Sequence, residues 1–239
     1  MDIFFWPVMD LLILGFLGIY LSSFDIQGID IIALLIGAVI LWQIVDRSQN
    51  AISVYFLEEV WERNFLNIFV TPLKLSEFFL AGVILGVIRI CIVGVIMGTL
   101  AFLLYHFNLL SFGLVLAPYA LNLFLFGLVL ALFINGIILR FGSSAQVMAF
   151  GMAILAQPVS AVYYPVSSLP SWIQPISYLL PTSYIFESLR ALSSGAPFEW
   201  GSFFIPLLLN IIYLILVWFF FSAMFKQVKK LGRLLKLQT

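Results

Sequence analysis

Long apolar runs alternate with short polar stretches along this chain of 239 residues. Six runs reach or approach the roughly twenty residues that a helix needs to cross about 30 Å of hydrocarbon. They comprise residues 4–21, 29–45, 78–107, 112–139, 145–164 and 203–225. Each run is continuously apolar, whereas the strands of a membrane barrel alternate apolar and polar residues. The pattern therefore predicts an all-α membrane protein, with six transmembrane helices in one domain that covers residues 1–239.

The composition agrees with this prediction. Apolar residues make up 64% of the chain and charged residues only 9%, and the mean hydropathy is +1.17. A single soluble core could not bury so much apolar surface, so membrane lipids are the expected surroundings. Eleven basic and eleven acidic residues leave no net charge, which argues against a nucleic-acid partner. One cysteine, Cys91, cannot form a disulfide framework or a thiolate metal cluster, so no metal site is predicted.

The basic residues predict how the chain is oriented. Short loops that carry lysine and arginine remain in the cytoplasm. Nine of the eleven basic residues follow predicted spans two, four and six, and so lie on one side: Arg47, Arg63, Lys74, Arg140, Lys226, Lys229, Lys230, Arg233 and Lys236. Both termini are therefore expected in the cytoplasm, with the first apolar run retained as a span. The cell membrane of a bacterium or an archaeon fits this arrangement.

A charged and aromatic segment lies between the second and third predicted spans. It contains Glu58, Glu59, Trp61, Glu62, Arg63 and Asn64. Apolar and polar residues here fall on different halves of a helix, which predicts an amphipathic helix over about 57–70. Thr71-Pro72 would end that helix. The segment can contact a partner protein, or it can lie on the lipid headgroups as an interfacial helix.

A second unusual segment joins the fifth and sixth predicted spans. Its prolines and aromatic residues include Pro165, Pro170, Trp172, Pro175, Pro181 and Tyr184. Prolines at this spacing prevent a full span, so short half-helices that dip into the outer leaflet are expected over about 165–191. Such a cap would close the outer end of a pathway. A tightly packed aromatic belt at the outer interface is the alternative.

One arginine falls deep inside a predicted span. Arg89 lies twelve residues after Glu77, or roughly 18 Å along a helix. Because an unpaired charge at this depth is costly, we expect Arg89 to face protein, on the same side as the small residues Gly82 and Gly86. Asp10 of the first span is the predicted partner. A structural ion pair between two spans is favoured here over a contact with substrate.

These features stand in an order that resembles the permease subunits of ABC transporters of the second exporter type. The resemblance covers nearly the whole chain and rests on an ordered set of motifs. These are Phe5-Trp6-Pro7-Val8-Met9-Asp10, Glu59-Val60-Trp61-Glu62-Arg63-Asn64, Thr71-Pro72-Leu73 with Glu77, and Tyr164-Pro165-Val166-Ser167-Ser168-Leu169-Pro170 with Trp172, Pro175, Pro181, Tyr184, Glu187 and Arg190-Ala191-Leu192. Members of the family usually begin with an amphipathic helix before the first span, whereas this chain begins almost directly at the span.

The resemblance implies a function for the two polar segments. The segment at 57–70 would be a coupling helix that docks on a separate ABC ATP-binding subunit, and 165–191 would be the external re-entrant helices. A second permease copy would complete the pathway, most simply as a homodimer. The chain has no Gly-x4-Gly-Lys-Ser/Thr loop, so it would not itself be an enzyme, and ATP and magnesium would be bound by the partner. The function implied by the resemblance is export of an amphipathic, lipid-like or drug-like substrate.

Two other function classes compete with this interpretation. Glu58-Glu59-x3-Arg63 and Phe102-x3-His106 each match a motif of intramembrane metalloproteases, but His106 is the only histidine in the chain. The predicted topology also places Glu58 and His106 on opposite membrane faces. A channel or an ion-driven transporter is the other alternative, and few acidic residues within the spans are available to couple ions.

Overall fold

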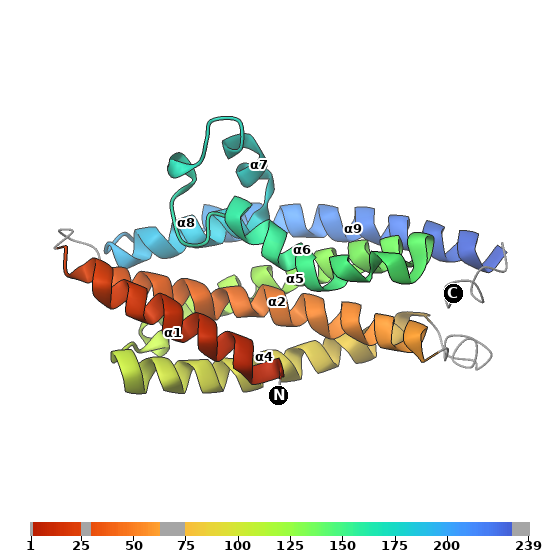
Figure 1. Ribbon diagram of the computed structural model, residues 1–239. Coiled ribbons are helices and arrows are strands. Elements are labelled where there is room, and N and C mark those ends of the chain that lie inside the picture. The colour runs from red at the N-terminus through yellow and green to blue at the C-terminus, as the bar shows by residue number, and fades with distance from the viewer. Residues whose placement is uncertain (1, 25–29, 63–74, 231–239) are drawn as a thin grey trace.

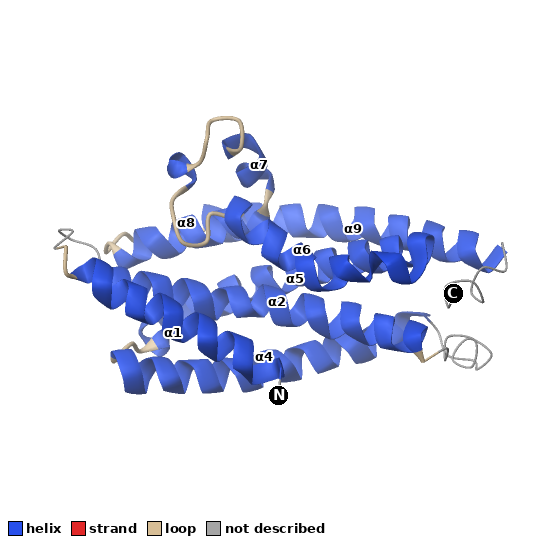
Figure 2. Ribbon diagram, in the orientation of Figure 1, coloured by secondary structure: helices blue, strands red, loops and turns tan. Residues whose placement is uncertain are grey.

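The computed structural model describes residues 2–24, 30–62 and 75–230. All regular elements of these residues are helices (Figure 2), which confirms the all-α prediction. The long elements are α1 (Asp2–Ser22), α2 (Ile31–Trp61), α4 (Leu75–Tyr105), α5 (Leu116–Phe141) and α9 (Gly201–Lys230). The shorter ones are η1 (Leu109–Val115), η2 (Gly142–Ala145), α6 (Gln146–Val159), η3 (Val166–Ser168), α7 (Gln174–Leu179) and α8 (Pro181–Ser193).

The number of spans differs from the sequence prediction. Among the described residues, five helices are long and apolar enough to cross a membrane: α1, α2, α4, α5 and α9. The predicted fifth span, 145–164, is instead the 14-residue helix α6, which is roughly 21 Å long and shorter than the hydrocarbon core. Helix α6 ends at Val159, and Ala161 then adopts a positive φ of 52° that no α-helix can continue. Apart from Pro158 and Ser160, the sequence around this turn is apolar, so the apolar run did not predict the turn.

Helix α2 also departs from the prediction, because it does not end near Val45. It continues to Trp61, through the polar stretch that the sequence assigned to a loop. Ala51, Phe56 and Leu57 are completely buried in this continuation, so packing holds it in the helix. The predicted separate helix at 57–70 is therefore only in part observable. Its first residues form the last turn of α2, and residues 63–70 lie outside the described part of the chain.

Helix α2 lies at the centre of the bundle and packs against α1, α4 and α5, while α5 packs against α9 (Figure 1). In the most apolar stretch of α2, 61% of the residues are buried, against 11% in α9. The end of α2 at Trp61 and the end of α9 lie at the same end of the bundle, which we call the tip end (Figure 1). Helix α9 begins at the opposite end, which we call the loop end. The segment with η3 and α7 stands out from the side of the bundle.

Small residues set how closely α2 approaches its neighbours. A Cβ atom added to Gly127 of α5 would overlap the Ser48 hydroxyl and lie 2.9 Å from the Val45 carbonyl oxygen of α2. On α4, Gly86 packs on α2 beside Ala51, whereas Gly94 has no neighbour within 4 Å. Only part of the glycine pattern on α4 therefore serves helix packing within this chain.

We expect Gly127→Ala to destabilise the bundle, because the added methyl group forces α2 and α5 apart. The expected cost is about 1–3 kcal/mol, which is typical of overpacking in a close contact. Gly94→Ala is the matched control, since its methyl group enters open space and should leave stability unchanged or slightly raised. Thermal unfolding of the purified variants in detergent measures both. Equal unfolding midpoints for the two variants would show that this contact does not limit the approach of the helices.

Candidate functional site

The last turn of α2 presents acidic and aromatic side chains at the tip end. Glu58 and Glu62 are exposed, and Trp61 has 47% of its surface exposed. The Glu62 N–H donates to the Glu58 carbonyl oxygen at 2.8 Å, so the helical turn extends to Glu62. Glu59 is half-buried. We call Glu58, Trp61 and Glu62 the α2 tip. Arg63 and Asn64, which the sequence grouped with them, lie outside the described residues.

The charges of the α2 tip repel one another within the chain. Glu58 and Glu62 are four residues apart, and Trp61 is three residues from Glu58, so all three share one face of the helix. Like charges at this spacing destabilise a helix by a few tenths of a kcal/mol. A basic groove that accepts Trp61 and faces both carboxylates would remove this repulsion. The α2 tip is thus suited to a basic protein surface with an apolar pocket.

An aromatic cluster connects the α2 tip to two other spans. Phe56 packs against both Phe79 of α4 and Phe221 of α9, with ring centroids 6.5 Å and 6.1 Å away. Phe79 and Phe221 are themselves 4.8 Å apart and nearly perpendicular. The preceding residue of α2, Tyr55, stacks on Phe78 of α4, with ring centroids 4.9 Å apart. We call these five residues the aromatic joint. Their rings pack α2 against α4 and α9 directly before the α2 tip.

Hydroxyl groups hold the segment between α6 and α9 in place. The Thr182 hydroxyl donates to the Ser160 hydroxyl at 2.8 Å. Ser177 lies at hydrogen-bond distance from the Val159 carbonyl oxygen, and 3.1 Å from the Ser183 hydroxyl oxygen. Ser160, Ser177, Thr182 and Ser183 are buried. These bonds attach α7 and the start of α8 to the end of α6, so the two short helices are held beside α6.

Three of the four prolines that the sequence analysis named in this segment lie at the start of a helix. Pro165 precedes η3, Pro175 and Pro181 lie in the first turns of α7 and α8, and Pro170 is exposed in the connection. Trp172 is 72% exposed, and the Tyr184 ring lies 6.3 Å from the Tyr178 ring. Proline is tolerated at these positions because the first N–H groups of a helix have no partner within it.

Two charged residues of α8 clamp the chain that leaves α6. The Val166 N–H donates to Glu187 Oε1 at 2.6 Å. Arg190 Nη2 lies 3.2 Å from the same oxygen, and Arg190 Nη1 donates to the Val162 carbonyl oxygen at 3.3 Å. Burial lowers the pKa of the Arg190 guanidinium, and the charge of Glu187 opposes that shift. The sequence analysis named Glu187 and Arg190 only as part of a motif. Their contacts show that they hold the chain after α6 against α8, and we call this pair the clamp.

Asp10 has a different partner from the one predicted. Gln43 Nε2 of α2 donates to Asp10 Oδ2 at 3.4 Å. Within the described residues, the salt bridges are Arg47–Asp46 and Arg190–Glu187, and Arg89 belongs to neither. The predicted Asp10–Arg89 ion pair is therefore not formed within this chain. Arg89 is half-buried on α4.

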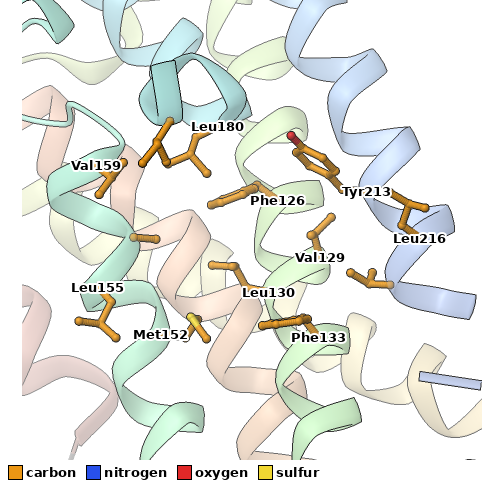
Figure 3. Close-up of a pocket in the computed structure, with 13 residues that line it drawn as sticks. Phe126, Val129, Leu130, Phe133, Met152, Leu155, Val159, Leu180, Tyr213 and Leu216 are labelled. Atoms are coloured by element: carbon orange, nitrogen blue, oxygen red, sulfur yellow. The ribbon is translucent and has the colours of Figure 1, made fainter. Parts of the chain in front are cut away.

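A groove lies at the side of the bundle between α5, α6, α7 and α9 (Figure 3). It encloses about 560 Å³, and its lining is apolar except for Tyr213. The Tyr213 hydroxyl donates to the Leu179 carbonyl oxygen at 2.8 Å, so it offers no free donor to the groove. Phe126 and Leu130 of α5 form part of the wall (Figure 3). The groove is suited to hydrocarbon, and its volume is typical of ligand pockets.

The residues proposed for metal chemistry are not brought together. Glu58 lies near the tip end of α2, and His106 directly follows α4 at the loop end. Within the described part of the chain, no group of three or more histidine, cysteine, aspartate or glutamate residues could hold a metal ion. The geometry thus gives no support to the metalloprotease alternative.

The comparisons with known proteins agree with the order of these elements. A family model described as ABC-2 type transporter matches residues 3–193, from α1 through the end of α8. The comparison with curated proteins gave no match. The family is one of membrane transport domains that are not themselves catalytic. Since the match spans most of the chain, including the α2 tip and the clamp, the chain belongs to the ABC-2 type transporter family.

Proposed function

We propose that this permease subunit belongs to an ATP-driven exporter of an amphipathic, lipid-like or drug-like substrate. ATP hydrolysis takes place on a separate ATP-binding subunit, which docks on the α2 tip. A second copy of the chain completes the pathway. The observation that carries this proposal is the α2 tip, whose exposed carboxylates and tryptophan stand directly on the aromatic joint. Family membership supports the proposal, since permeases of this kind generally work with an ATP-binding subunit.

The aromatic joint suggests how ATP binding acts on the membrane spans. Closure of the ATP-binding subunits moves the α2 tip, and α2 transmits that movement because its helix is unbroken from Ile31 to Trp61. Phe79 and Phe221 couple α4 and α9 to the same movement. The bundle then shifts between an inward-open and an outward-open state, which is a change of equilibrium rather than covalent chemistry.

Charge and composition support the orientation and the substrate class. Arg140, Lys226 and Lys230 are at the tip end, together with the α2 tip, and Arg190 is nearer the loop end. This asymmetry supports a cytoplasmic tip end, in a bacterial or archaeal cell. The apolar groove of about 560 Å³ supports a substrate or lipid with a hydrocarbon part. Helices α7 and α8 then form the external cap.

Reversing the charge of the α2 tip should break the contact with the ATP-binding subunit. We expect Glu58→Lys combined with Glu62→Lys to reduce co-purification of that subunit at least tenfold, and permease-dependent ATP hydrolysis with it. Both side chains are exposed, so the fold should remain intact. Glu199→Lys is the matched control, because it makes the same change on an exposed residue at the loop end. Unchanged co-purification of the double variant would place the ATP-binding subunit elsewhere.

Removing the Glu187 carboxylate should loosen the external cap. We expect Glu187→Ala to leave the Val166 N–H and Arg190 without this acceptor, at a cost of about 1–3 kcal/mol in local stability. Hydrogen exchange measured by mass spectrometry should then be about tenfold faster in a peptide that contains Val166.

Glu199→Ala serves as the control for this experiment. Its carboxylate is exposed and has no part in the clamp, so exchange at Val166 should match the unsubstituted protein. Equal exchange at Val166 in both variants would mean that Glu187 does not hold the cap.

A further inference from the structure

Asp10 is an exposed carboxylate within a membrane span. It lies on α1, six residues after the start of the apolar stretch Phe4–Ser22. Acidic residues in a span usually face the bundle interior or a hydrated cavity, because hydrocarbon does not solvate their charge. The side of α1 that carries Asp10 is therefore not an ordinary lipid-facing surface.

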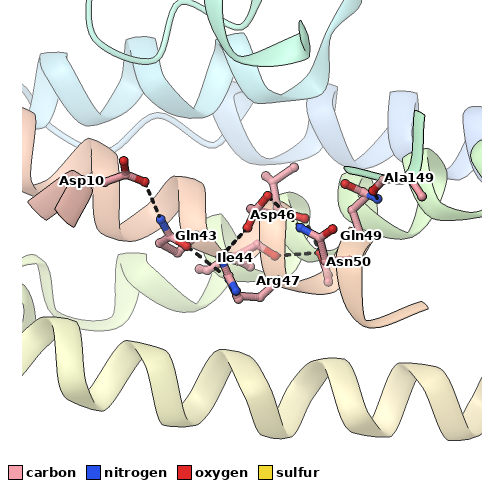
Figure 4. Close-up of polar contacts among 10 residues, drawn as sticks. Asp10, Gln43, Ile44, Asp46, Arg47, Gln49, Asn50 and Ala149 are labelled. Carbon is pink, nitrogen blue, oxygen red and sulfur yellow. Dashed lines mark hydrogen bonds and ion pairs between the residues drawn. The ribbon is translucent and has the colours of Figure 1, made fainter. Parts of the chain in front are cut away.

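Hydrogen bonds connect Asp10 to a polar face of α2 (Figure 4). Gln43 donates to Asp10 at 3.4 Å and accepts from Arg47 Nε at 3.3 Å. Arg47 Nη2 lies 2.7 Å from Asp46 Oδ2, and Asn50 donates to Asp46 at 2.9 Å. This network contains two carboxylates and one guanidinium. Asp46 neutralises Arg47 directly, so the network has one negative charge in excess, and Asp10 is its exposed end.

A further polar pair approaches from the end of α6. Gln157 Nε2 donates to the Tyr163 hydroxyl at 2.8 Å. Tyr163 packs against the apolar cluster that contains Leu11 of α1 and Ile36 of α2, and both burial and the charge of Asp10 raise the pKa of Tyr163. Polar groups from α1, α2 and the segment after α6 thus approach one another, although apolar residues dominate all three.

The surface of α1 around Asp10 is complementary to an amphipathic cation. Trp6, Asp10, Ile13 and Leu17 lie at helical spacing on one face. Trp6 is 62% exposed, Ile13 59% and Leu17 42%. The face therefore offers one carboxylate between apolar side chains, and the Trp6 ring can also attract a cation.

We propose that this face of α1 binds the positively charged group of an amphipathic organic cation, with Asp10 as the counter-charge and Trp6 and Ile13 against the apolar body. This inference rests on the proposed function and names the substrate class for the same pathway. A direct contact between two copies through this face would bring like charges together. A hydrated pathway that a cation can enter avoids that repulsion.

Two probes of similar shape and opposite charge test the proposal. The full chain is reconstituted in nanodiscs of zwitterionic phosphatidylcholine, and binding of tetraphenylphosphonium is compared with that of tetraphenylborate. We expect saturable binding of the cation, weakened about tenfold or more by Asp10→Asn and retained by Asp10→Glu. Binding of the anion should not be weakened by Asp10→Asn. Glu199→Gln, which removes an exposed carboxylate at the loop end, should bind the cation like the unsubstituted protein.

The outcomes separate this proposal from the exporter proposal. Binding is measured without the ATP-binding subunit, so failure of the contact at the α2 tip would not affect the result. Cation affinity that is equal in the unsubstituted protein and Asp10→Asn would overturn the proposed site. A shift of Asp10→Asn between monomer and dimer, with cation affinity unchanged, would also overturn it and assign Asp10 to a contact between copies. Thermal unfolding confirms that the variants compared are folded.

Discussion

The burial of α2 is the constraint on which the rest of the bundle depends. Helices α1, α4 and α5 all pack on it, and the close approach of α5 requires a glycine at position 127. Because α2 is enclosed, its polar side chains must find partners within the protein. Gln43, Arg47 and Asp46 satisfy one another through the network that ends at Asp10. Packing and polar pairing therefore act together to keep α2 in the centre of the bundle.

The same helix joins the two sites that matter for the proposed transport cycle. Asp46 and Trp61 are fifteen residues apart on α2, or roughly 22 Å along its axis. One lies in the network that reaches the α1 face, and the other is in the α2 tip. A movement of the α2 tip therefore changes the position of the network without any intervening hinge in the described helix. The aromatic joint extends this movement to α4 and α9.

The sequence predicted the helical class and most spans, because long apolar runs specify membrane helices directly. It also predicted short helices after Tyr164, since prolines exclude a full span. The predicted end of α2 was wrong, because the charges of Asp46 and Arg47 suggested a loop. In the structure these two residues pair with each other, so the helix continues past them. The prediction failed at α6 for the opposite reason, since the sequence after Val159 is mostly apolar, apart from Ser160, although the backbone turns at Ala161. The partner of Asp10 was predicted wrongly, because counting residues along a helix estimates how deep a side chain lies in the membrane. It does not show which neighbouring helix the side chain faces.

The central claim is that the ATP-binding subunit contacts the α2 tip, and cross-linking tests it most directly. Cys91, the single cysteine, is first replaced by serine, and Trp61→Cys or Glu199→Cys is then introduced as the only thiol. A thiol-specific, photoactivatable reagent is attached in the presence of the ATP-binding subunit. The account predicts a cross-link to that subunit from position 61 and none from position 199. A cross-link from position 199 alone would contradict it.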